Sequence, residues 1–495
     1  MPRKMTKLEA VREFEHKAAE RISASDRLQF HLTPLVGWMN DPNGFCYYDG
    51  AYHLFYQYHP YSTVWGPMHW GHAVSTDLLH WNYMPCALAP DTVADAAGCF
   101  SGSAVPMPDG RLLLMYTGVQ PAGTGHKELQ MQCIAAGNGR DFCKDQHNPV
   151  ISTEQLPDGF HAVDFRDPKI WQEGGTYYSV IACRHEKHQG SVLLFESADG
   201  RQWKFVSVLD SSCGELGKMW ECPDFFALDG MQVLLVSPQE MRATADSEFH
   251  AGEGTVALLG LYDPATHAFA RQKVQAVDYG LDFYAPQTTL APDGRRIMVA
   301  WMQSWATVPG TPCAGGRPWF GRMTLPRELT IKDGRLYQTP VREIETLWQG
   351  KTELSGVAVE ERAALPGISG RSLDLTVRID VDASPECRRF TLRFAEDAAL
   401  YNEIRCDLDR CELAFDRSHG GSRRDIPHTR HIKAAPQNGK LTLRLILDKD
   451  CAELFVNNGE RVLSAVLDTP LEAQGITFGA DGGPVNLDIV QYTLA

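Results

Sequence analysis

The chain has 495 residues, of which 43% are hydrophobic and 22% are charged. This length exceeds what one hydrophobic core usually serves, so we expect two domains. The formal net charge of −15 argues against nucleic acid as a partner, because binding a phosphate backbone normally requires a basic face.

The N-terminal residues predict a helix and no membrane segment. Leu8, Val11, Phe14 and Ile22 recur at helical spacing among charged residues, which predicts an amphipathic helix over residues 5–23. Glu and Lys interrupt each apolar run, so we expect neither a signal peptide nor a membrane partner. The sequence therefore predicts a cytoplasmic protein.

The cysteines and histidines form no metal-binding pattern. Thirteen cysteines, an odd number, run from Cys46 to Cys451 without a C-x-x-C pair, which is typical of reduced thiols in a cytosol. Histidines gather at His69 and His72, but no H-E-x-x-H motif or matched Cys/His set accompanies them. We predict no metal site and no cofactor.

Five copies of a two-strand unit follow between residues 38 and 340. In each copy, two short β-type runs flank an Asp-Gly or Gly-Gly pair, which is the signature of a hairpin. The paired runs are 44–48 with 52–58, 104–107 with 111–116, 169–172 with 177–182, 224–227 with 232–237, and 287–290 with 296–302.

Each copy opens just after a distinctive residue, and these residues recur at intervals of 54 to 66 residues. They are Asp41, Ser101, Asp167, Glu221 and Tyr284. Such a period predicts a five-bladed β-propeller, in which the innermost strands line one central channel. Carboxylates far apart in the sequence would then meet. The alternative is a β-rich domain with regularly spaced hairpins and no radial symmetry.

The repeat ends near residue 340, and residues 341–355 read as a helical or extended connector. Four runs with period two follow, at 372–381, 389–394, 440–447 and 486–494, a pattern typical of antiparallel sheets with one solvated face. We therefore expect an all-β chain in four parts. They are an N-terminal helical segment (1–30), a propeller (31–340), a linker (341–355) and a β-sandwich (356–495).

Three short motifs carry the carboxylates that the repeat would bring together. They are Trp38-Met39-Asn40-Asp41-Pro42-Asn43-Gly44, Arg166-Asp167-Pro168 and Glu221-Cys222-Pro223-Asp224. These motifs resemble the signatures of glycoside hydrolase family 32, which contains the invertases, sucrose-6-phosphate hydrolases and fructanases. The resemblance implies that Asp41 is the nucleophile, Glu221 the general acid/base and Asp167 a stabiliser of the transition state.

These residue types suit the cleavage of a sugar bond. A retaining glycosidase needs one carboxylate that attacks the anomeric carbon and one carboxyl group that protonates the leaving oxygen, about 5–5.5 Å apart. Pro42 disfavours helical geometry at Asp41, and the Asn43-Gly44 pair favours a tight backbone path after it. Taken one at a time, each motif could instead be an ordinary turn.

The same resemblance implies a set of substrate-binding residues: Trp38, Asn40, Gln57, Trp65, Ser101, Arg166 and Trp301. Amides, a hydroxyl and a guanidinium suit a polyol, and indoles offer an apolar face to a furanose ring. The alternative for Trp38, Trp65 and Trp301 is a place in the hydrophobic core.

We therefore expect a retaining β-fructofuranosidase whose partner is a small saccharide, sucrose or sucrose 6-phosphate. A fructan hydrolase and a carbohydrate-binding propeller without catalysis are the alternatives. A homo-oligomer is compatible with the sequence but not required by it. Residues 184–188 form the densest basic cluster of the repeats, so Arg184 or Lys187 is the predicted contact of a substrate phosphate. The alternative is that this cluster is a solvated loop without a ligand.

Overall fold

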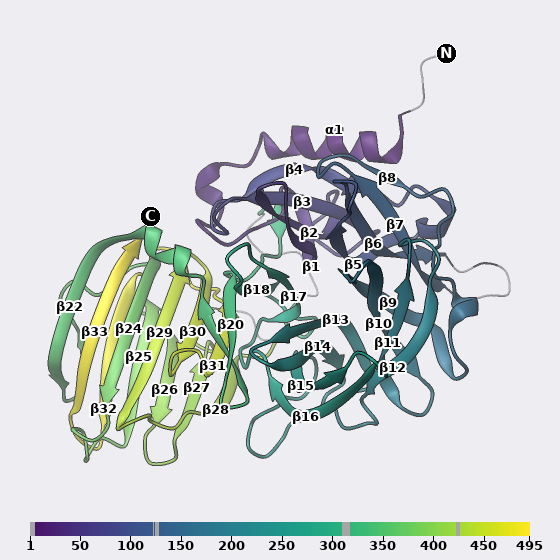
Figure 1. Cartoon of the computed structure of the whole chain (residues 1–495). Coiled ribbons are helices and arrows are strands. Elements are labelled where there is room, and N and C mark those ends of the chain that lie inside the picture. Colours follow the sequence, from purple (N-terminus) through teal and green to yellow (C-terminus); the bar gives the residue numbers. More distant parts are fainter. Residues whose placement is uncertain (1–4, 122, 124–127, 309–316, 422–425) are drawn as a thin grey trace.

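The computed structural model describes residues 5–121, 123, 128–308, 317–421 and 426–495. These residues form mostly β-strands, with one α-helix, α1 (Lys7–Ala19), and four short 3-10 helices. Figure 1 shows a C-terminal β-sandwich beside a larger N-terminal β-domain, with α1 lying across the top of the latter. The mostly-β prediction with a C-terminal sandwich is confirmed at this level.

Five successive sheets make up the N-terminal domain. The first contains β1 (Gly37–Tyr48), β2 (Ala51–His59), β3 (His69–Ser75) and β4 (Asn82–Leu88), with the short β19 (Trp319–Phe320) beside β1. The second contains β5 (Gly98–Pro106), β6 (Leu112–Gln120), β7 (Leu129–Gly137) and β8 (Phe142–Lys144). The third contains β9 (Phe160–Glu173), β10 (Thr176–His185), β11 (Gln189–Ser197) and β12 (Lys204–Ser211).

The last two sheets of this domain have the same four-strand form. One contains β13 (Met219–Leu228), β14 (Met231–Gln239), β15 (Val256–Asp263) and β16 (Ala268–Ala276). The other contains β17 (Tyr284–Leu290), β18 (Arg296–Trp301), β20 (Arg327–Lys332) and β21 (Arg335–Pro340). Each predicted run falls on a strand, to within one residue at its ends.

The predicted turn pairs connect the first two strands of these sheets. In the first sheet, Asp49 and Gly50 have φ angles of 47° and 81°. In the fourth, Asp229 and Gly230 have nearly the same pair of angles, 46° and 81°. Two successive residues with positive φ make the type I′ turn that matches the twist of a hairpin, and Asp-Gly is a favoured sequence for it.

The first strands of the five sheets, β1, β5, β9, β13 and β17, are hydrogen-bonded to one another in a ring. The side-chain bonds that connect them are Ser101 to Asp41, Ser103 to the Pro168 carbonyl, Lys169 to Asp224, the Thr288 amide to Asp224 and the Phe45 amide to Gln287. Segments more than fifty residues apart in the sequence are therefore in direct contact.

The C-terminal sandwich consists of two six-stranded sheets. One contains β22 (Trp348–Val359), β33 (Val485–Leu494), β24 (Ser372–Asp380), β29 (Lys440–Asp448), β30 (Cys451–Val456) and β31 (Arg461–Val466). The other contains β23 (Arg362–Ala364), β32 (Gly475–Asp481), β25 (Arg389–Glu396), β26 (Asn402–Asp407), β27 (Glu412–Asp416) and β28 (Thr429–Lys433). Alternate residues such as Leu375 and Leu392 are fully buried between them, as period-two patterning requires.

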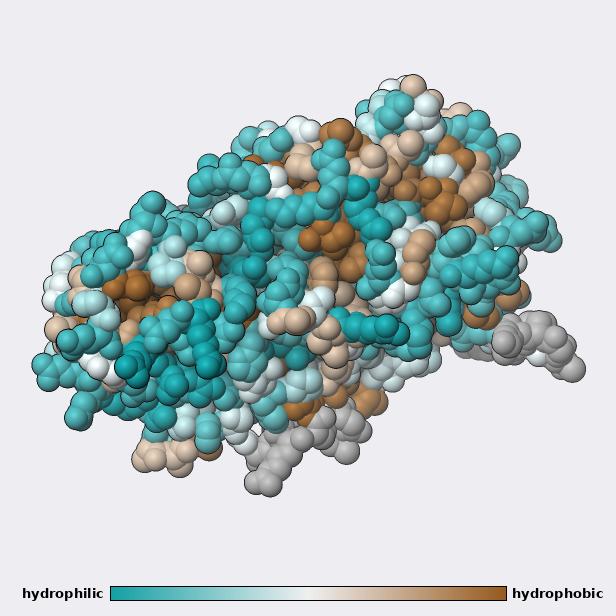
Figure 2. Space-filling model, turned by 90° about the horizontal axis from the view of Figure 1, so that it is seen from below, coloured by the Kyte–Doolittle hydropathy of each residue, from teal (hydrophilic) through white to brown (hydrophobic). Residues whose placement is uncertain are grey.

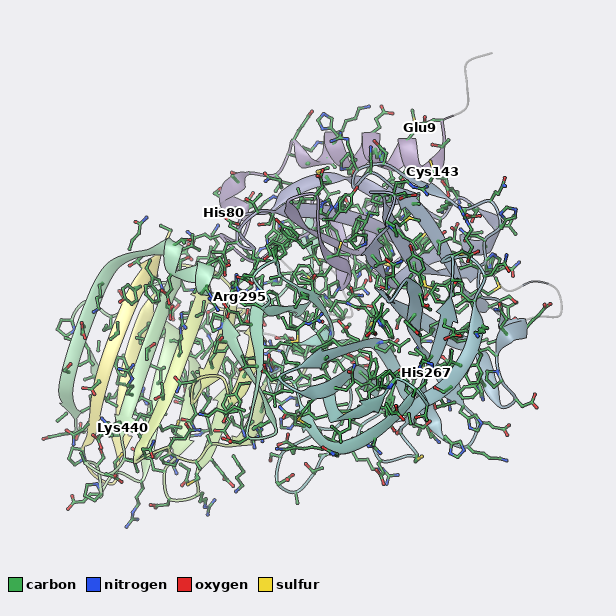
Figure 3. All side chains as sticks on the ribbon, in the orientation of Figure 1. Glu9, His80, Cys143, His267, Arg295 and Lys440 are labelled. Carbon is green, nitrogen blue, oxygen red and sulfur yellow. The ribbon has the colours of Figure 1, made fainter. Side chains whose placement is uncertain are left out.

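The connector between the domains is shorter than residues 341–355. It is the 3-10 helix η4 (Arg342–Leu347), after which β22 begins at Trp348 and pairs with β33. Because β22 is an edge strand with mostly exposed side chains, no apolar alternation marks it in the sequence. Arg295, which lies at the junction of the domains (Figure 3), donates hydrogen bonds to Glu343 of η4 and Glu328 of β20.

Helix α1 is shorter than the predicted 5–23 and covers the free edge of the first sheet. It starts at a capping box in which Thr6 and Glu9 bond reciprocally to each other's backbone N–H. Arg12 donates to the Cys86 carbonyl of β4 at 2.9 Å, and Glu15 accepts from the Cys86 N–H at 2.8 Å. These bonds satisfy backbone groups of an edge strand that would otherwise face water.

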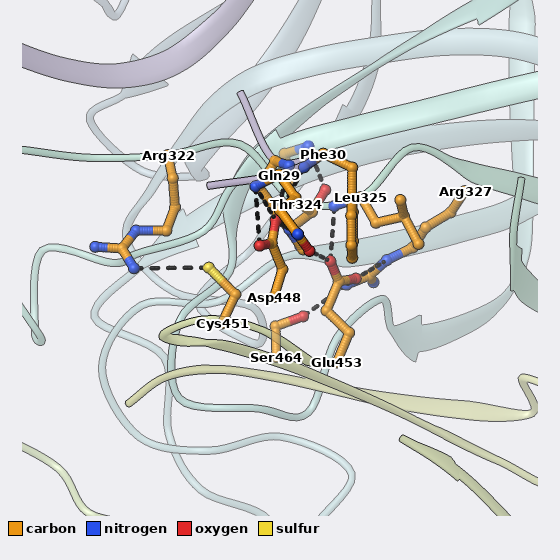
Figure 4. A network of polar contacts seen from close by, with 12 residues as sticks. Gln29, Phe30, Arg322, Thr324, Leu325, Arg327, Asp448, Cys451, Glu453 and Ser464 are labelled. Atoms are coloured by element: carbon orange, nitrogen blue, oxygen red, sulfur yellow. Dashed lines mark hydrogen bonds and ion pairs between the residues drawn. The ribbon is translucent and has the colours of Figure 1, made fainter. Parts of the chain in front are cut away.

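A buried polar network holds the two domains together (Figure 4). His31 lies between two carboxylates of the sandwich, with its ring nitrogens 2.9 Å from Asp448 and 2.9 Å from Glu453. Glu453 also accepts hydrogen bonds from Arg327 of β20, whose side chain is fully buried. A buried charge requires such partners, so the position of each domain depends on the other.

Figure 2 shows that hydrophilic residues dominate the face seen from below, where the hydrophobic residues form separate patches. Homo-oligomer formation stays a prediction. The helices of the described residues are all too short or too polar to cross a lipid bilayer.

Candidate active site

The first strand of each N-terminal sheet is bulged at the same place. The pairing with its neighbour shifts between Met39 and Pro42, Phe100 and Gly102, Arg166 and Lys169, Glu221 and Asp224, and Tyr284 and Gln287. Asp167, Cys222 and Ala285 have φ angles of 64°, 47° and 53°, which are uncommon for residues other than glycine. Such bulges re-aim side chains and are frequent next to active sites.

An open cavity of about 530 Å³ lies over these bulges. This volume falls within the range of small-molecule sites. The charged side chains of the described residues that line it are Asp41, Glu128, Asp164, Arg166, Asp167, Glu221 and Glu253. Six carboxyl groups thus surround one guanidinium, and a polyol with many hydroxyl donors suits such a surface.

Asp41 lies on the bulge of β1. Its Oδ2 accepts a hydrogen bond from Ser101 Oγ at 2.6 Å, and its Oδ1 is buried with no hydrogen-bond partner among the described residues. Burial raises the pKa of Asp41 to about 6, the hydrogen bond from Ser101 opposes this rise, and the charge of Glu221 adds to it. Oδ1 therefore has a free lone pair, and the pKa of the carboxyl group lies near neutral pH. These are properties of a nucleophile.

Glu221 lies on β13 and is held by three side chains. Arg166 Nε donates to Glu221 Oε1 at 3.0 Å. Gln239 and the Tyr284 hydroxyl donate to Oε2 at 2.7 and 2.6 Å. These bonds fix the carboxyl group in one orientation, which a group that exchanges a proton with a substrate oxygen requires.

Asp167 is buried beside both other carboxyl groups, and Cys222 connects it to Asp41. The Cys222 N–H donates to Asp167 Oδ2 at 3.0 Å, and Cys222 Sγ lies 3.5 Å from Asp41 Oδ2 and 3.6 Å from Asp167 Oδ2. Burial raises the pKa of Asp167 above its usual value; the adjacent Arg166 opposes this rise, and the charges of Glu221 and Asp41 add to it. Burial and the surrounding carboxylates raise the pKa of the Cys222 thiol far above its usual value, so the thiol keeps its proton and serves as a weak donor.

Five of the predicted binding residues line the cavity: Asn40, Gln57, Trp65, Ser101 and Arg166. Gln57 donates to the Cys99 carbonyl at 3.0 Å, so its side-chain oxygen is available as an acceptor. Trp65 is 48% exposed and packs edge-on against Phe100 at the cavity mouth. A half-exposed indole can stack on a sugar ring.

Trp38 and Trp301 do not line the cavity, which corrects their prediction as sugar contacts. Trp38 is 2% exposed and Trp301 is fully buried, in one cluster behind the cavity wall. Trp38 supports the site indirectly, because its Nε1 donates to Asn40 Oδ1 at 2.8 Å. Trp305 is the tryptophan from this region that lines the cavity, and it stacks on Trp38.

Several lining residues were not predicted from the sequence, and most come from loops or strand ends without a motif. They are Phe100, Glu128, Gln130, Val163, Asp164, Gln239, Glu253 and Trp305. Tyr284 was predicted only as the residue that opens the fifth unit, at the position that Glu221 occupies in the fourth, and not as a site residue. Within the described residues, no group of three or more His, Cys, Asp or Glu side chains is arranged to hold a metal ion.

A sugar-sized cavity with three clustered carboxyl groups is the kind of site found in glycoside hydrolases. Residues 31–340 match the sequence model of the Glycosyl hydrolases family 32 N-terminal domain, and residues 343–494 match that of the family's C-terminal domain. The chain therefore belongs to glycoside hydrolase family 32, as the motifs predicted.

Proteins that are similar over nearly the whole chain include enzymes that act on sugars. A raffinose invertase of Escherichia coli is 37% identical over 92% of this chain and 92% of its own. A sucrose-6-phosphate hydrolase of Escherichia coli is 34% identical over 97% of each chain. The structure of a Bombyx mori family 32 β-fructofuranosidase aligns with a TM-score of 0.84 at 35% identity, covering 99% of both chains. A mutant of that enzyme has been solved in complex with sucrose, with a TM-score of 0.84 at 35% identity over 98% of both chains.

Proposed function

We propose that the protein is a retaining β-fructofuranosidase that hydrolyses the glycosidic bond of sucrose or sucrose 6-phosphate. The observation that carries this proposal is the meeting of Asp41, Asp167 and Glu221 in one sugar-sized cavity. The names of the relatives support the substrates, since they include a sucrose-6-phosphate hydrolase and a β-fructofuranosidase solved with sucrose.

In the proposed mechanism, Asp41 attacks the anomeric carbon of fructose while Glu221 protonates the departing oxygen. Water then hydrolyses the fructosyl-enzyme, with Glu221 as the base. Asp167 accepts hydrogen bonds from fructose hydroxyls, and these bonds strengthen as positive charge develops on the ring. Ser101 supports the first step because its hydrogen bond to Oδ2 stabilises the ionised form of Asp41.

We further propose that the five sheets of the N-terminal domain are the blades of a five-bladed propeller. The ring of contacts among their first strands supports this arrangement. We also propose domain limits of 31–340 and 348–495, the second starting earlier than the predicted 356 because β22 begins at Trp348; the family matches to residues 31–340 and 343–494 support them. A cytoplasmic location is also proposed, and the similarity to a sucrose-6-phosphate hydrolase of Escherichia coli supports it.

The test is hydrolysis of sucrose, sucrose 6-phosphate and inulin by the purified protein, followed by carbon-13 NMR on labelled fructose. We expect glucose or glucose 6-phosphate together with fructose that is initially in the β configuration. Initial release of α-fructose would refute retention. A kcat/KM for inulin above that for both sucrose substrates would favour a fructan hydrolase instead, and no turnover at all would favour a binding protein.

A further inference from the structure

A row of side chains with alternating charge leads from Glu221 to Arg184. Glu221 accepts from Arg166 at 3.0 Å, and Arg166 donates to Asp164 at 3.1 Å. Arg184 follows, with Nη1 at 4.0 Å from the second oxygen of Asp164. Asp164 lines the cavity, and Arg184, which does not itself line it, borders the cavity at Asp164 with an exposed side chain.

The strand geometry explains why Arg184 is next to Asp164. Arg166 of β9 pairs with Ala182 of β10. Side chains alternate along a strand, so Arg184, two residues beyond Ala182, is on the same face of the sheet as Ala182.

Arg184 also has unused capacity to bind an anion. A guanidinium has five N–H donors in a planar fork, and the one ion pair found for Arg184 among the described residues is long. Its side chain is 40% exposed, whereas that of Arg166 is 11% exposed. Arg184 can therefore bind a phosphate in the bidentate manner that this side chain favours.

The neighbouring turn distinguishes Arg184 from the other cation of the cluster. Lys187 is 77% exposed and lies 4.0 Å from Glu186 in the turn between β10 and β11. The His185 ring accepts from the Lys187 and His188 amides, which fixes the turn. None of the described bonds of Lys187 reaches a residue that lines the cavity.

We propose that Arg184 forms a subsite for the 6-phosphate of the leaving glucose, and that this subsite sets a preference for the phosphorylated substrate. The inference rests on the proposed function, because fructose must lie against Asp41, Asp167 and Glu221 for the glucose unit to extend toward Arg184. Asp164 is a carboxylate beside the subsite, and its charge is compensated by the hydrogen bond from Arg166. Glu128 also lines the cavity and disfavours an anion there, so Arg184 provides the attraction that offsets it.

The test compares kcat/KM on sucrose 6-phosphate and on sucrose for the wild-type enzyme and three variants. Arg184→Gln should lower the ratio of the two values by roughly 10- to 100-fold, the scale of one or two charge-assisted hydrogen bonds. Arg184→Lys should lower it less, because it keeps the charge but loses the planar fork. Lys187→Gln is the matched control and should change the ratio by less than about twofold, the scale of a screened surface charge.

A second readout uses the product, without turnover of substrate. Inhibition of sucrose hydrolysis by glucose 6-phosphate should weaken in Arg184→Gln, while inhibition by glucose stays the same. Equal changes on both substrates, or an equal effect of Lys187→Gln, would overturn the subsite and leave the proposed function intact. A wild-type enzyme inactive on both sugars would overturn the proposed function itself.

Discussion

The hydroxyl of Tyr284 donates a hydrogen bond to Glu221 Oε2 at 2.6 Å, across two different sheets of the N-terminal domain. The Tyr284 ring is almost fully buried, and burial beside Glu221 raises the pKa of its phenol well above 10. The phenol therefore remains protonated, and a donor, near neutral pH. Glu221 is oriented by a residue from the fifth repeat unit, and this residue has no titration of its own near neutral pH.

The first prediction is that Tyr284→Phe lowers kcat for sucrose by about tenfold, the scale of one hydrogen bond. KM should change little, because Tyr284 does not line the cavity. Tyr279→Phe is the matched control, since Tyr279 also donates to a glutamate, Glu248, away from the site. An unchanged kcat in Tyr284→Phe, or an equal loss in the control, would contradict a positioning role.

The second prediction separates the two catalytic roles proposed for Asp41 and Glu221. Both Asp41→Ala and Glu221→Gln should nearly abolish sucrose hydrolysis, because each removes one of two cooperating groups. On an aryl β-fructofuranoside, whose leaving group needs little protonation, Glu221→Gln should recover most of its bond-cleavage rate. Asp41→Ala should not. Pre-steady-state release of the aryl group measures this step, and equal losses on both substrates would reverse the assignment.

The third prediction concerns the acidic limb of the pH profile. Asp41 must be ionised to attack carbon, and its pKa is raised to about 6, so kcat/KM should fall as the pH drops through 6. Ser101 donates to the charged form and lowers this pKa. Ser101→Ala should therefore move the acidic limb to higher pH, by about one unit, the scale of one such hydrogen bond. A limb that stays in place or moves to lower pH would exclude Asp41 as the titrating group.

The sequence was sufficient to predict the strands and the three carboxyl groups because both depend on local patterns that recur. Each hairpin has its own turn pair, and each first strand carries one distinctive residue just before the apolar run. The bulges themselves have no such mark. At three of them Asp167, Cys222 and Ala285 have positive φ, and no pattern in the sequence indicates this.

The residues that were missed have long-range partners. Glu128, Glu253 and Trp305 reach the cavity from loops whose sequences carry no period. Trp301 was misplaced because an apolar strand gives no information about which face meets the cavity, and it proved to be fully buried. His31 lies in an irregular segment, and its partners are more than 400 residues away in the sequence.

The fourth prediction is a loss of stability at alkaline pH that depends on His31. Its hydrogen bonds to Asp448 and Glu453 outweigh the effect of burial and raise the pKa of His31 to about 9. A raised pKa means that the folded state binds the proton more tightly than the unfolded state. The stabilisation is fully present below pH 6.5 and is lost as the pH rises through 9, by about 3 kcal/mol at most.

The measurement is the free energy of unfolding of wild type and His31→Gln by urea titration from pH 6 to pH 10. The difference between the two proteins should shrink across this range, because only the wild type loses a proton from the network. A difference that stays constant with pH would mean that His31 is neutral in the folded protein.

The last prediction is that the N-terminal domain does not fold alone. A chain that ends at Leu347 keeps Arg327 and Asp278 but loses their partners Glu453 and Ser464. In the full protein, Glu453 and Ser464 accept hydrogen bonds from Arg327, and Ser464 donates one to Asp278. It also loses Asp448, which accepts from the backbone amides of residues 29–31. A buried charge that loses its partner costs roughly 3–5 kcal/mol, which is a large fraction of the stability of a typical domain.

Apolar contacts between the domains also indicate that the N-terminal domain does not fold alone. Ile446, Phe455 and Val462 of the sandwich belong to the same buried cluster as residues of the first and fifth sheets, and removal of the sandwich would expose that surface. We expect the truncated chain to be insoluble, or to bind a hydrophobic dye and lack near-ultraviolet circular dichroism. Arg327→Met in the full chain tests the contribution of the buried polar network separately. This variant should destabilise the protein. It should leave kcat on sucrose within about twofold, because none of the described bonds of Arg327 reaches the cavity. A soluble, fully active fragment ending at Leu347 would show that the N-terminal domain needs neither the network nor the sandwich.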